Sequence, residues 1–410
     1  MKRFQLWLTL TVLMMLFGVR VDAHDIAVEN DDGVTIYYVW TNDQTELAVS
    51  YRGNRISSSE RNRKDYKDEV VIPASVLYNN EKYNVTSISS YAFYRCTGLK
   101  SITIPNSVTK IDSYAFSGCT GLPCITIPNS INSIDDYAFS GCTGLTSITI
   151  PNSVNSIDDY AFSGCTGLTS ITIPNSITSI GYKPFNGCKN LASADVRCSV
   201  NTDHLFDGCE GLISLYANCR SIGGWLKYIQ SLKTLEIGDV VDTIVNNAFC
   251  GSGNVGGNLI FLTCKSLEEI KVSSNNLNFM SVNGVLYNKA MDSLVCYPFN
   301  KPDETWSTPT TLRTMTSDFC NVTSPLKEIA FNGAMDYFFT PGANDERTEK
   351  LKISFSQLPA SSTNPPANTG IKTCDYYIPK GSWIAYKKLI STDRRDNKTL
   401  VYELDGNEIC

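Results

Sequence analysis

A 23-residue segment recurs almost unchanged through the first half of the chain. The copy at 96–118 reads CTGLKSITIPNSVTKIDSYAFSG, and near-copies follow directly at 119–141, 142–164 and 165–187. A fixed period of this length is typical of proteins built from stacked repeats, in which each repeat buries its apolar stripe against its neighbours. The core of such a chain grows along one axis. Its 410 residues therefore need no set of separate globular domains.

The pattern inside one repeat predicts a short β-strand followed by a turn. From Leu99 to Ile104 the spacing L-x-x-I-x-I places alternate residues on opposite faces, so that Ser101 and Thr103 face outward. Pro105 cannot donate a backbone hydrogen bond and therefore closes the strand. Stacked repeats align such strands in parallel, about 4.8 Å apart. The prediction is a solenoid with short parallel strands on a concave face and an irregular, turn-rich convex side.

Phenylalanine and cysteine each return at one fixed position of the repeat, which predicts that both line the core. They are Phe93, Phe116, Phe139, Phe162 and Phe185, with Cys96, Cys119, Cys142, Cys165 and Cys188. Stacking of the cysteines would admit disulfides between neighbouring coils, but cysteine also serves as a small buried apolar residue. We favour a stacked ladder of free thiols. Cys124 instead replaces the outward-facing Ser101 and is expected to be exposed.

A longer motif joins the end of one repeat to the strand of the next. The motif is AFxGCxxLxxIxIPxS closed by Val or Ile, and it is matched at 115–131 and 138–154. With this motif the chain resembles the BspA-like leucine-rich-repeat family of secreted and surface proteins from bacteria and protists. Segments that look like the family's entry repeat, hairpin-bearing repeat and closing unit lie at 66–73 with 83–88, at 282–287 with 294–298, and at 377–386. The resemblance implies a leucine-rich-repeat solenoid over most of residues 66–390.

The first 23 residues have the features of a secretory signal peptide. Lys2 and Arg3 supply the positive start, an apolar stretch follows at 6–17, and Ala23 ends a cleavage site of small residues. The apolar stretch is too short to span a bilayer. We therefore expect a mature chain that begins at His24, carries no transmembrane segment, and is secreted or displayed on the cell surface.

The pattern divides the remaining chain into segments. Residues 24–65 contain two alternating stretches, which predict a β-hairpin cap over the open end of the solenoid. The solenoid is expected over 66–340, with a glycine-rich insert near 250–261. Polar, proline-bearing residues at 341–370 predict a long loop. Residues 371–410 are expected to form a closing repeat and a tail.

The sequence carries no catalytic or metal-binding motif. After loss of the signal peptide the histidines are His24 and His204, and His204 occupies a repeat position usually held by tyrosine, so a surface role is expected. Phosphate loops, dinucleotide fingerprints and H-E-x-x-H are missing, and Cys198, Cys209 and Cys219 lack the close pairs of structural zinc sites. The mature chain has 32 basic and 40 acidic residues, a net charge of −8, which does not favour nucleic acid. We predict no enzyme activity, no cofactor and no metal.

The outward strand positions are the predicted binding face. In the regular repeats these positions carry mostly hydroxyl groups, which are also ordinary solvated strand formers. In the later repeats they carry an aromatic ring and charges, and because tyrosine is frequent at binding hot spots, the region near Tyr216 is favoured. The candidate partner-binding residues are Tyr216, Glu236, Glu269, Lys271, Thr126, Thr149 and Thr172.

Three functions follow as hypotheses. The leading one is binding of an extracellular protein, with adhesion to host matrix or other cells implied by the family resemblance. The second is a surface protein that captures glycans such as polysaccharide or mucin. Glycan binding favours aromatic platforms, and the predicted strand face has only Tyr216 and, near its end, Tyr377. The third, a hydrolytic enzyme, is disfavoured because no catalytic constellation is present.

Overall fold

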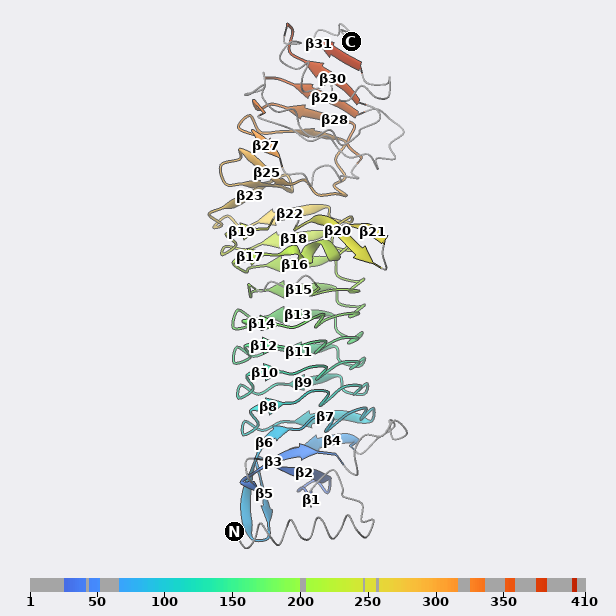
Figure 1. The fold of residues 1–410 in the computed structure, drawn as a ribbon, viewed down its shortest axis with the longest axis vertical. Helices are drawn as coiled ribbons and strands as arrows, with labels where there is room; N and C mark the ends of the chain where they lie inside the picture. Colours follow the sequence, from blue (N-terminus) through green and yellow to red (C-terminus); the bar gives the residue numbers. More distant parts are fainter. Residues whose placement is uncertain are drawn as a thin grey trace. The chain divides into compact units, whose positions relative to one another are not determined.

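Stacked coils of short parallel β-strands build the protein, as a computed structural model shows (Figure 1). The chain divides into two compact units: unit 1 lies within residues 1–191 and 204–211, and unit 2 lies within 192–203 and 212–410. The predicted solenoid is confirmed. The structure describes residues 26–41, 44–51, 66–199, 204–245, 248–255, 258–315, 325–335, 351–357, 374–381 and 400–403. The expected signal peptide at 1–23 lies outside the described residues.

A three-stranded sheet caps the start of unit 1. Its strands are β1 (Ile26–Glu29), β2 (Thr35–Thr41) and β3 (Glu46–Ser50). The predicted hairpin is formed by β2 and β3, and β1 adds a third antiparallel strand. The cap joins the repeats because β3 pairs in parallel with β6 (Glu81–Ile88), which also forms a hairpin with β5 (Ser75–Tyr78). Ile36, Tyr38 and Leu47 are fully buried beneath the cap.

Each regular coil of unit 1 contributes to two ladders of strands. The first is a row of the predicted strands, in which β4 pairs with β7 and β9 with β11. Its strands are β4 (Asp68–Val71), β7 (Leu99–Thr103), β9 (Cys124–Thr126), β11 (Ser147–Thr149) and β13 (Ser170–Ile173). The second continues from β6 through β8 (Lys110–Ile111), β10 (Ser133–Ile134), β12 (Ser156–Ile157) and β14 (Ser179–Ile180), all in parallel. This narrow ladder was not predicted, because two residues per coil are too few to give a strand pattern in the sequence. The common register of the coils makes it regular.

Phenylalanine rings and cysteine thiols fill the interior of unit 1 as predicted. The rings from Phe93 to Phe185 are buried and stack with centroids 5.0, 5.3, 5.4 and 5.3 Å apart. Five of the thiols also form hydrogen bonds that the sequence did not reveal. Cys142 Sγ donates a hydrogen bond to the Phe116 carbonyl oxygen at 3.1 Å, and Cys119, Cys165, Cys188 and Cys209 do the same one coil apart. All eleven cysteines whose side chains the structure describes are free, which confirms the thiol ladder.

Two glycines of each regular repeat occupy positions where a side chain would be unfavourable. Gly141 has φ of +70°, in the left-handed region that favours glycine. Gly144 lies directly against the preceding coil, and a Cβ atom there would collide with the carbonyl oxygen of Thr120. The glycines therefore set how closely successive coils approach.

Unit 2 begins with a regular parallel sheet. It contains β15 (Ser193–Val196), β16 (Ser214–Ala217), β18 (Thr234–Ile237) and β22 (Glu269–Val272). A narrow second ladder pairs β17 (Ser221–Ile222) with β19 (Thr243–Ile244), and the short 3-10 helix η2 (Gly224–Tyr228) buries Trp225 and Leu226. The predicted insert is an antiparallel hairpin of β20 (Cys250–Val255) and β21 (Asn258–Thr263).

A buried amide supports the turn after β22. The Asn276 side chain is fully buried and its Nδ2 donates to the carbonyl oxygens of Gly238 and Val241 at 2.8 and 3.0 Å. Its Oδ1 accepts from the backbone N–H groups of Asn278 and Phe279 at 2.9 and 2.8 Å. One side chain thus satisfies four backbone groups, and nothing in the repeat pattern indicated it.

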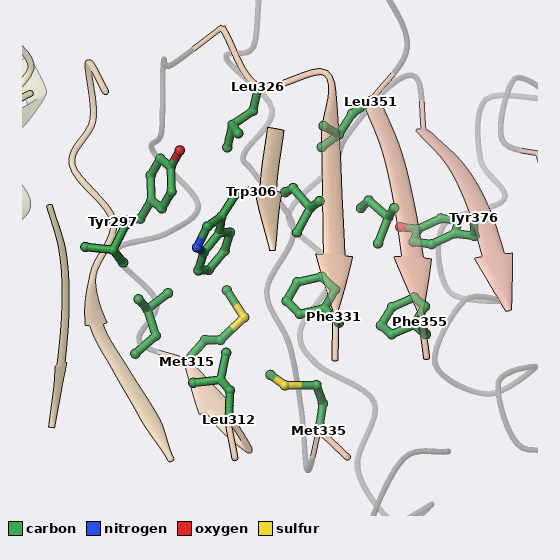
Figure 2. Close-up of a cluster of buried hydrophobic side chains, with 14 of the residues drawn as sticks. Tyr297, Trp306, Leu312, Met315, Leu326, Phe331, Met335, Leu351, Phe355 and Tyr376 are labelled. Atoms are coloured by element: carbon green, nitrogen blue, oxygen red, sulfur yellow. The ribbon is translucent and has the colours of Figure 1, made fainter. Parts of the chain in front are cut away.

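The later part of unit 2 has two further sheets. The first contains β23 (Phe279–Val282), β24 (Val285–Asn288), β25 (Ser293–Cys296) and β27 (Thr314–Met315). The second is parallel and contains β26 (Thr305–Ser307), β28 (Glu328–Phe331), β29 (Leu351–Phe355), β30 (Cys374–Ile378) and β31 (Leu400–Glu403). Figure 2 shows their core, where Trp306 packs on Tyr297 and Phe331 stacks on Phe355 with ring centroids 4.8 and 5.3 Å apart.

One expectation for this region is wrong. The stretch 341–370 was expected to be a loop, yet residues 351–355 form β29 in register with β28. Leu351, Ile353 and Phe355 alternate and are buried. A single strand of five residues gives only a short alternating pattern, and the polar and proline residues around it favoured the prediction of a loop. The rest of that stretch lies outside the described residues, apart from 356–357.

We expect Phe139→Ala to lower the free energy of unfolding by about 3–5 kcal/mol, because it empties one position of the buried ring stack. Thr149→Ala, on the exposed side of β11, should change it by less than about 0.5 kcal/mol. Urea titration followed by circular dichroism measures both. Equal losses would mean that the inward and outward assignments are wrong.

Asn276→Ala should lower the free energy of unfolding by about 2 kcal/mol or more, because it removes the partner of four backbone groups. The adjacent Asn275→Ala is the matched control, because that side chain is exposed, and its loss should be nearly silent. Urea titration followed by circular dichroism measures both variants. A silent Asn276 variant would contradict the role given to the buried amide.

Native thiols should differ sharply in their reaction with iodoacetamide at pH 8. Burial raises the pKa of Cys119 well above its usual value, that of Cys198 to about 12 and that of Cys219 to about 11. Since the thiolate is the nucleophile, these three should remain unmodified while the exposed Cys124 reacts. Peptide mass spectrometry identifies the modified residues, with protein unfolded in urea as the control. Labelling of Cys119 at the rate of Cys124 would contradict this assignment.

Candidate functional site

The first sheet of unit 2 presents two columns of outward side chains. Backbone register pairs the residues of neighbouring strands, with Tyr216 opposite Asp195 on one side and Glu236 on the other. One column is Ser193, Ser214, Thr234 and Glu269, and the second is Asp195, Tyr216, Glu236 and Lys271. The intervening residues, Ala194, Leu215, Leu235 and Ile270, are buried. Strand alternation therefore brings all four later candidate residues together on one face (strands in Figure 1).

Ion pairs neutralise most of the charges on this face. Arg197 Nη2 lies 2.7 Å from Asp195 Oδ2, and its Nε lies 3.1 and 3.0 Å from the two Asp195 oxygens. Lys271 Nζ lies 3.1 Å from Glu269 Oε2 on its own strand. In the part of the chain that the structure describes, Glu236 has no ion pair. Its exposed carboxylate is the charge on this face that is left for a partner.

Tyr216 is half-buried between these charges. Burial, followed by the nearby carboxylates of Asp195, Asp239 and Glu236, raises the pKa of its phenol, and Arg197 opposes the shift. The phenol is therefore neutral at physiological pH. An aromatic ring on a rigid strand beside an unpaired carboxylate can contact a partner through apolar, hydrogen-bonding and ionic interactions together.

The corresponding face of unit 1 carries hydroxyl groups. Thr126 lies opposite Thr149, and Cys124 lies opposite Ser147. These residues and Thr172 are exposed, as the sequence analysis predicted. The outward positions of β9, β11 and β13 hold no aromatic or charged side chain. The three threonines are therefore brought into the predicted array, without the residue types that dominate binding hot spots.

Sequence reasoning missed a ladder of surface tyrosines in unit 1. The rings of Tyr91, Tyr114, Tyr137 and Tyr160 stack with centroids 4.8, 4.6 and 4.9 Å apart. All four residues have φ between 54° and 64°, a left-handed conformation that costs non-glycine residues on the order of 1–2 kcal/mol. Each stacked pair of rings stabilises the folded chain by about 0.5–1.5 kcal/mol. Because the ring faces cover one another, the ladder strengthens the coils and is not an open platform for sugar rings.

The recurrence of tyrosine at the 23-residue period was the available signal for this ladder. Periodicity alone does not distinguish a stacked ring from separate solvated rings. The difference arises from the left-handed backbone at each tyrosine, which aligns the side chains of successive coils. Glycine or asparagine in a sequence can indicate a left-handed backbone, but tyrosine does not. The repeat pattern therefore did not predict this conformation.

Tyr377, the other aromatic residue expected on the strand face, is also covered. Its ring stacks on Tyr402 with centroids 5.0 Å apart, and Lys352 Nζ lies 5.0 Å from its centroid. Lys352 also pairs with Glu328 at 2.9 Å. A cation of the chain itself thus joins an aromatic ring to a carboxylate on these strands.

The residues weighed for catalysis or zinc binding have local partners. His204 Nδ1 lies 2.9 Å from Asp207 Oδ2, which also pairs with Lys183 at 3.1 Å. Cys209 Sγ donates to Phe185, and Cys219 Sγ donates to the carbonyl oxygen of Ser221. Among the described residues, no three His, Cys, Asp or Glu side chains are arranged to hold a metal ion.

The described part of the chain contains no helix that is both long enough and apolar enough to cross a membrane.

Several solved structures are similar to this chain. A leucine-rich repeat protein from T. pallidum is 29% identical over 48% of this chain and 85% of its own, with a TM-score of 0.41. One from Bacteroides ovatus is 21% identical over 92% and 100%, with a TM-score of 0.42. A leucine rich cell surface protein from Faecalibacterium prausnitzii is 19% identical over 92% and 95%, with a TM-score of 0.41. No curated protein matches the sequence.

The repeats themselves match a defined family pattern. Residues 79–192 and 133–256 match the BspA type leucine rich repeat region, in 6 copies. This match covers the four regular repeats and, in unit 2, the strands β15, β16 and β18 of the first sheet. The recurring phenylalanine, cysteine and proline of the sequence, and the stacked coils they form, agree with it. The repeat region of this chain therefore belongs to the BspA-type leucine-rich-repeat family.

Proposed function

We propose that this chain is a secreted or surface-displayed binding protein without enzymatic activity, which adheres to extracellular proteins of a host or of other cells. The proposed contact surface is the outward face of β15, β16, β18 and β22. The observation that carries the proposal is the register of these strands, which places Tyr216 beside the unpaired carboxylate of Glu236.

The physical properties of this face suit protein binding. Its side chains stand on hydrogen-bonded strands, so little backbone conformational entropy remains to be lost when a partner binds. Tyrosine at the centre of such a face is a frequent hot spot. The surrounding charges, Arg197 with Asp195 and Lys271 with Glu269, favour specificity because only a complementary pattern avoids unpaired charge.

Glycan capture ranks below protein binding. Sugar recognition favours aromatic rings whose faces are open, and the stacked tyrosines of unit 1 cover each other. Tyr377 is covered on its ring by Lys352 and Tyr402. Export through residues 1–23 is part of the proposal and rests on the sequence alone.

Residues 24–410 immobilised on a sensor surface should bind at least one member of a panel of purified extracellular-matrix proteins. Tyr216→Ala should weaken that binding by about tenfold or more, which corresponds to about 1.4 kcal/mol. Thr103→Ala, at an exposed position of β7 in unit 1, is the matched control and should bind like the parent protein.

Two results would contradict the proposal. If every matrix protein fails while mucin or polysaccharide is retained, glycan capture takes first place. If a matrix protein binds but Tyr216→Ala is without effect, the contact surface lies elsewhere.

A further inference from the structure

The chain leaves one ionic position open on the outward face of unit 2. Of the charged side chains on β15, β16, β18 and β22, Asp195, Glu269 and Lys271 have ionic partners, and Glu236 has none among the residues that the structure describes. Lys271 is the cross-strand neighbour of Glu236, but its Nζ is held by Glu269 at 3.1 Å. The cation nearest in register is thus already engaged.

The ring next to Glu236 is open as well. Tyr216 is directly opposite Glu236 on the adjacent strand. No aromatic ring or cationic group of the described residues lies over the Tyr216 ring, in contrast to Tyr377. A carboxylate and an open aromatic ring therefore stand side by side, about 4.8 Å apart at the backbone.

The same chain shows that one cation can contact both kinds of group. On the later strands of unit 2, Lys352 Nζ lies 2.9 Å from Glu328 and 5.0 Å from the centre of the Tyr377 ring. There the lysine stands on β29, between the strand of the carboxylate and the strand of the ring. Tyr216 and Glu236 instead lie on adjacent strands, and no cation of the described residues contacts both.

We propose that this position receives an arginine side chain of the protein partner, with its guanidinium stacked on Tyr216 and paired with Glu236. The inference rests on the proposed function, since it assigns the anchor of the same contact surface.

Arginine fits better than lysine for a geometric reason. A planar guanidinium stacks on an aromatic ring and at the same time forms two parallel hydrogen bonds to a carboxylate. Arg197 already binds Asp195 through both Nε and Nη2 on the other side of Tyr216. The face thus contains one guanidinium–carboxylate pair of its own, and the carboxylate of Glu236 has no guanidinium beside it among the described residues.

Charge also selects the class of partner. The five groups Asp195, Arg197, Glu236, Glu269 and Lys271 carry a net charge of −1, and the nearby carboxylate of Asp239 adds a further negative charge beside Tyr216. An acidic segment would place like charges together at a cost, whereas an arginine-bearing segment supplies the opposite charge. The occupant is therefore an arginine-bearing segment of an extracellular protein.

Three fluorescent Gly/Ser peptides of equal length test the inference. One carries three arginines, the second three lysines and the third three citrullines, which keep the shape of arginine without its charge. Fluorescence anisotropy with residues 24–410 should give the tightest binding for the arginine peptide. Glu236→Gln should weaken it about tenfold, toward the citrulline peptide.

Matched variants separate a specific anchor from general charge. Glu69 is an exposed glutamate on the outward side of β4, and within the described part of the chain it has no ion pair and no aromatic cross-strand neighbour. Glu69→Gln removes the same charge and should leave arginine-peptide binding unchanged. Tyr216→Phe keeps the stacking ring and should bind within about twofold, whereas Tyr216→Leu should lose most of the binding.

The inference is overturned if the two glutamine variants weaken binding equally, if the lysine and arginine peptides bind alike, or if the arginine peptide does not bind. The matrix-protein panel keeps this failure distinct from failure of the proposed function. A matrix protein that depends on Tyr216 but not on Glu236 would retain the contact surface and reject the arginine anchor. An arginine peptide that depends on Glu236, with no matrix protein bound, would retain the anchor and reject adhesion.

Discussion

Hydrogen bonds that repeat at one position in every coil hold unit 1 together. The backbone N–H of Phe116 donates to the carbonyl oxygen of Ala138 at 2.8 Å, and that of Phe139 donates in the same way to Ala161. The cysteine thiols run in the opposite direction and satisfy the phenylalanine carbonyl oxygens. All other regularities, including the ring stacks and both strand ladders, require that neighbouring coils stay in this register. A shift by one residue would turn the apolar residues of the strands toward water.

Much of the fold could be predicted because the core residues of one repeat recur at the same positions of the next. Phe139 and Cys142 recur at a fixed period as apolar residues, and a stacked array buries such an apolar stripe between its coils. Features that depend on single contacts could not be predicted. Asn276 serves four backbone groups in an irregular turn, and the strand at 351–355 stands alone among polar residues. Neither recurs, so periodicity gave no information about them.

The candidate site shows the same division. Alternation in the strands was enough to place Tyr216, Glu236, Glu269 and Lys271 on one face. Which charges would pair was not accessible from the sequence, because Lys271 has glutamates both on its own strand and on the neighbouring strand. In the structure Lys271 forms its ion pair with Glu269, and Glu236 has no ion pair among the described residues. A rotamer of one lysine thus decides where the exposed negative charge lies.

The near-identity of the coils in unit 1 has an evolutionary consequence. Because Cys119, Cys142 and Cys165 meet the same surroundings, a coil can be copied or deleted by recombination between neighbouring repeats of the gene, and each remaining coil still finds a matching neighbour. Every such event changes the stack by about 4.8 Å. The chain can therefore change its length in equal steps over generations while the irregular coils that carry Tyr216 are inherited intact.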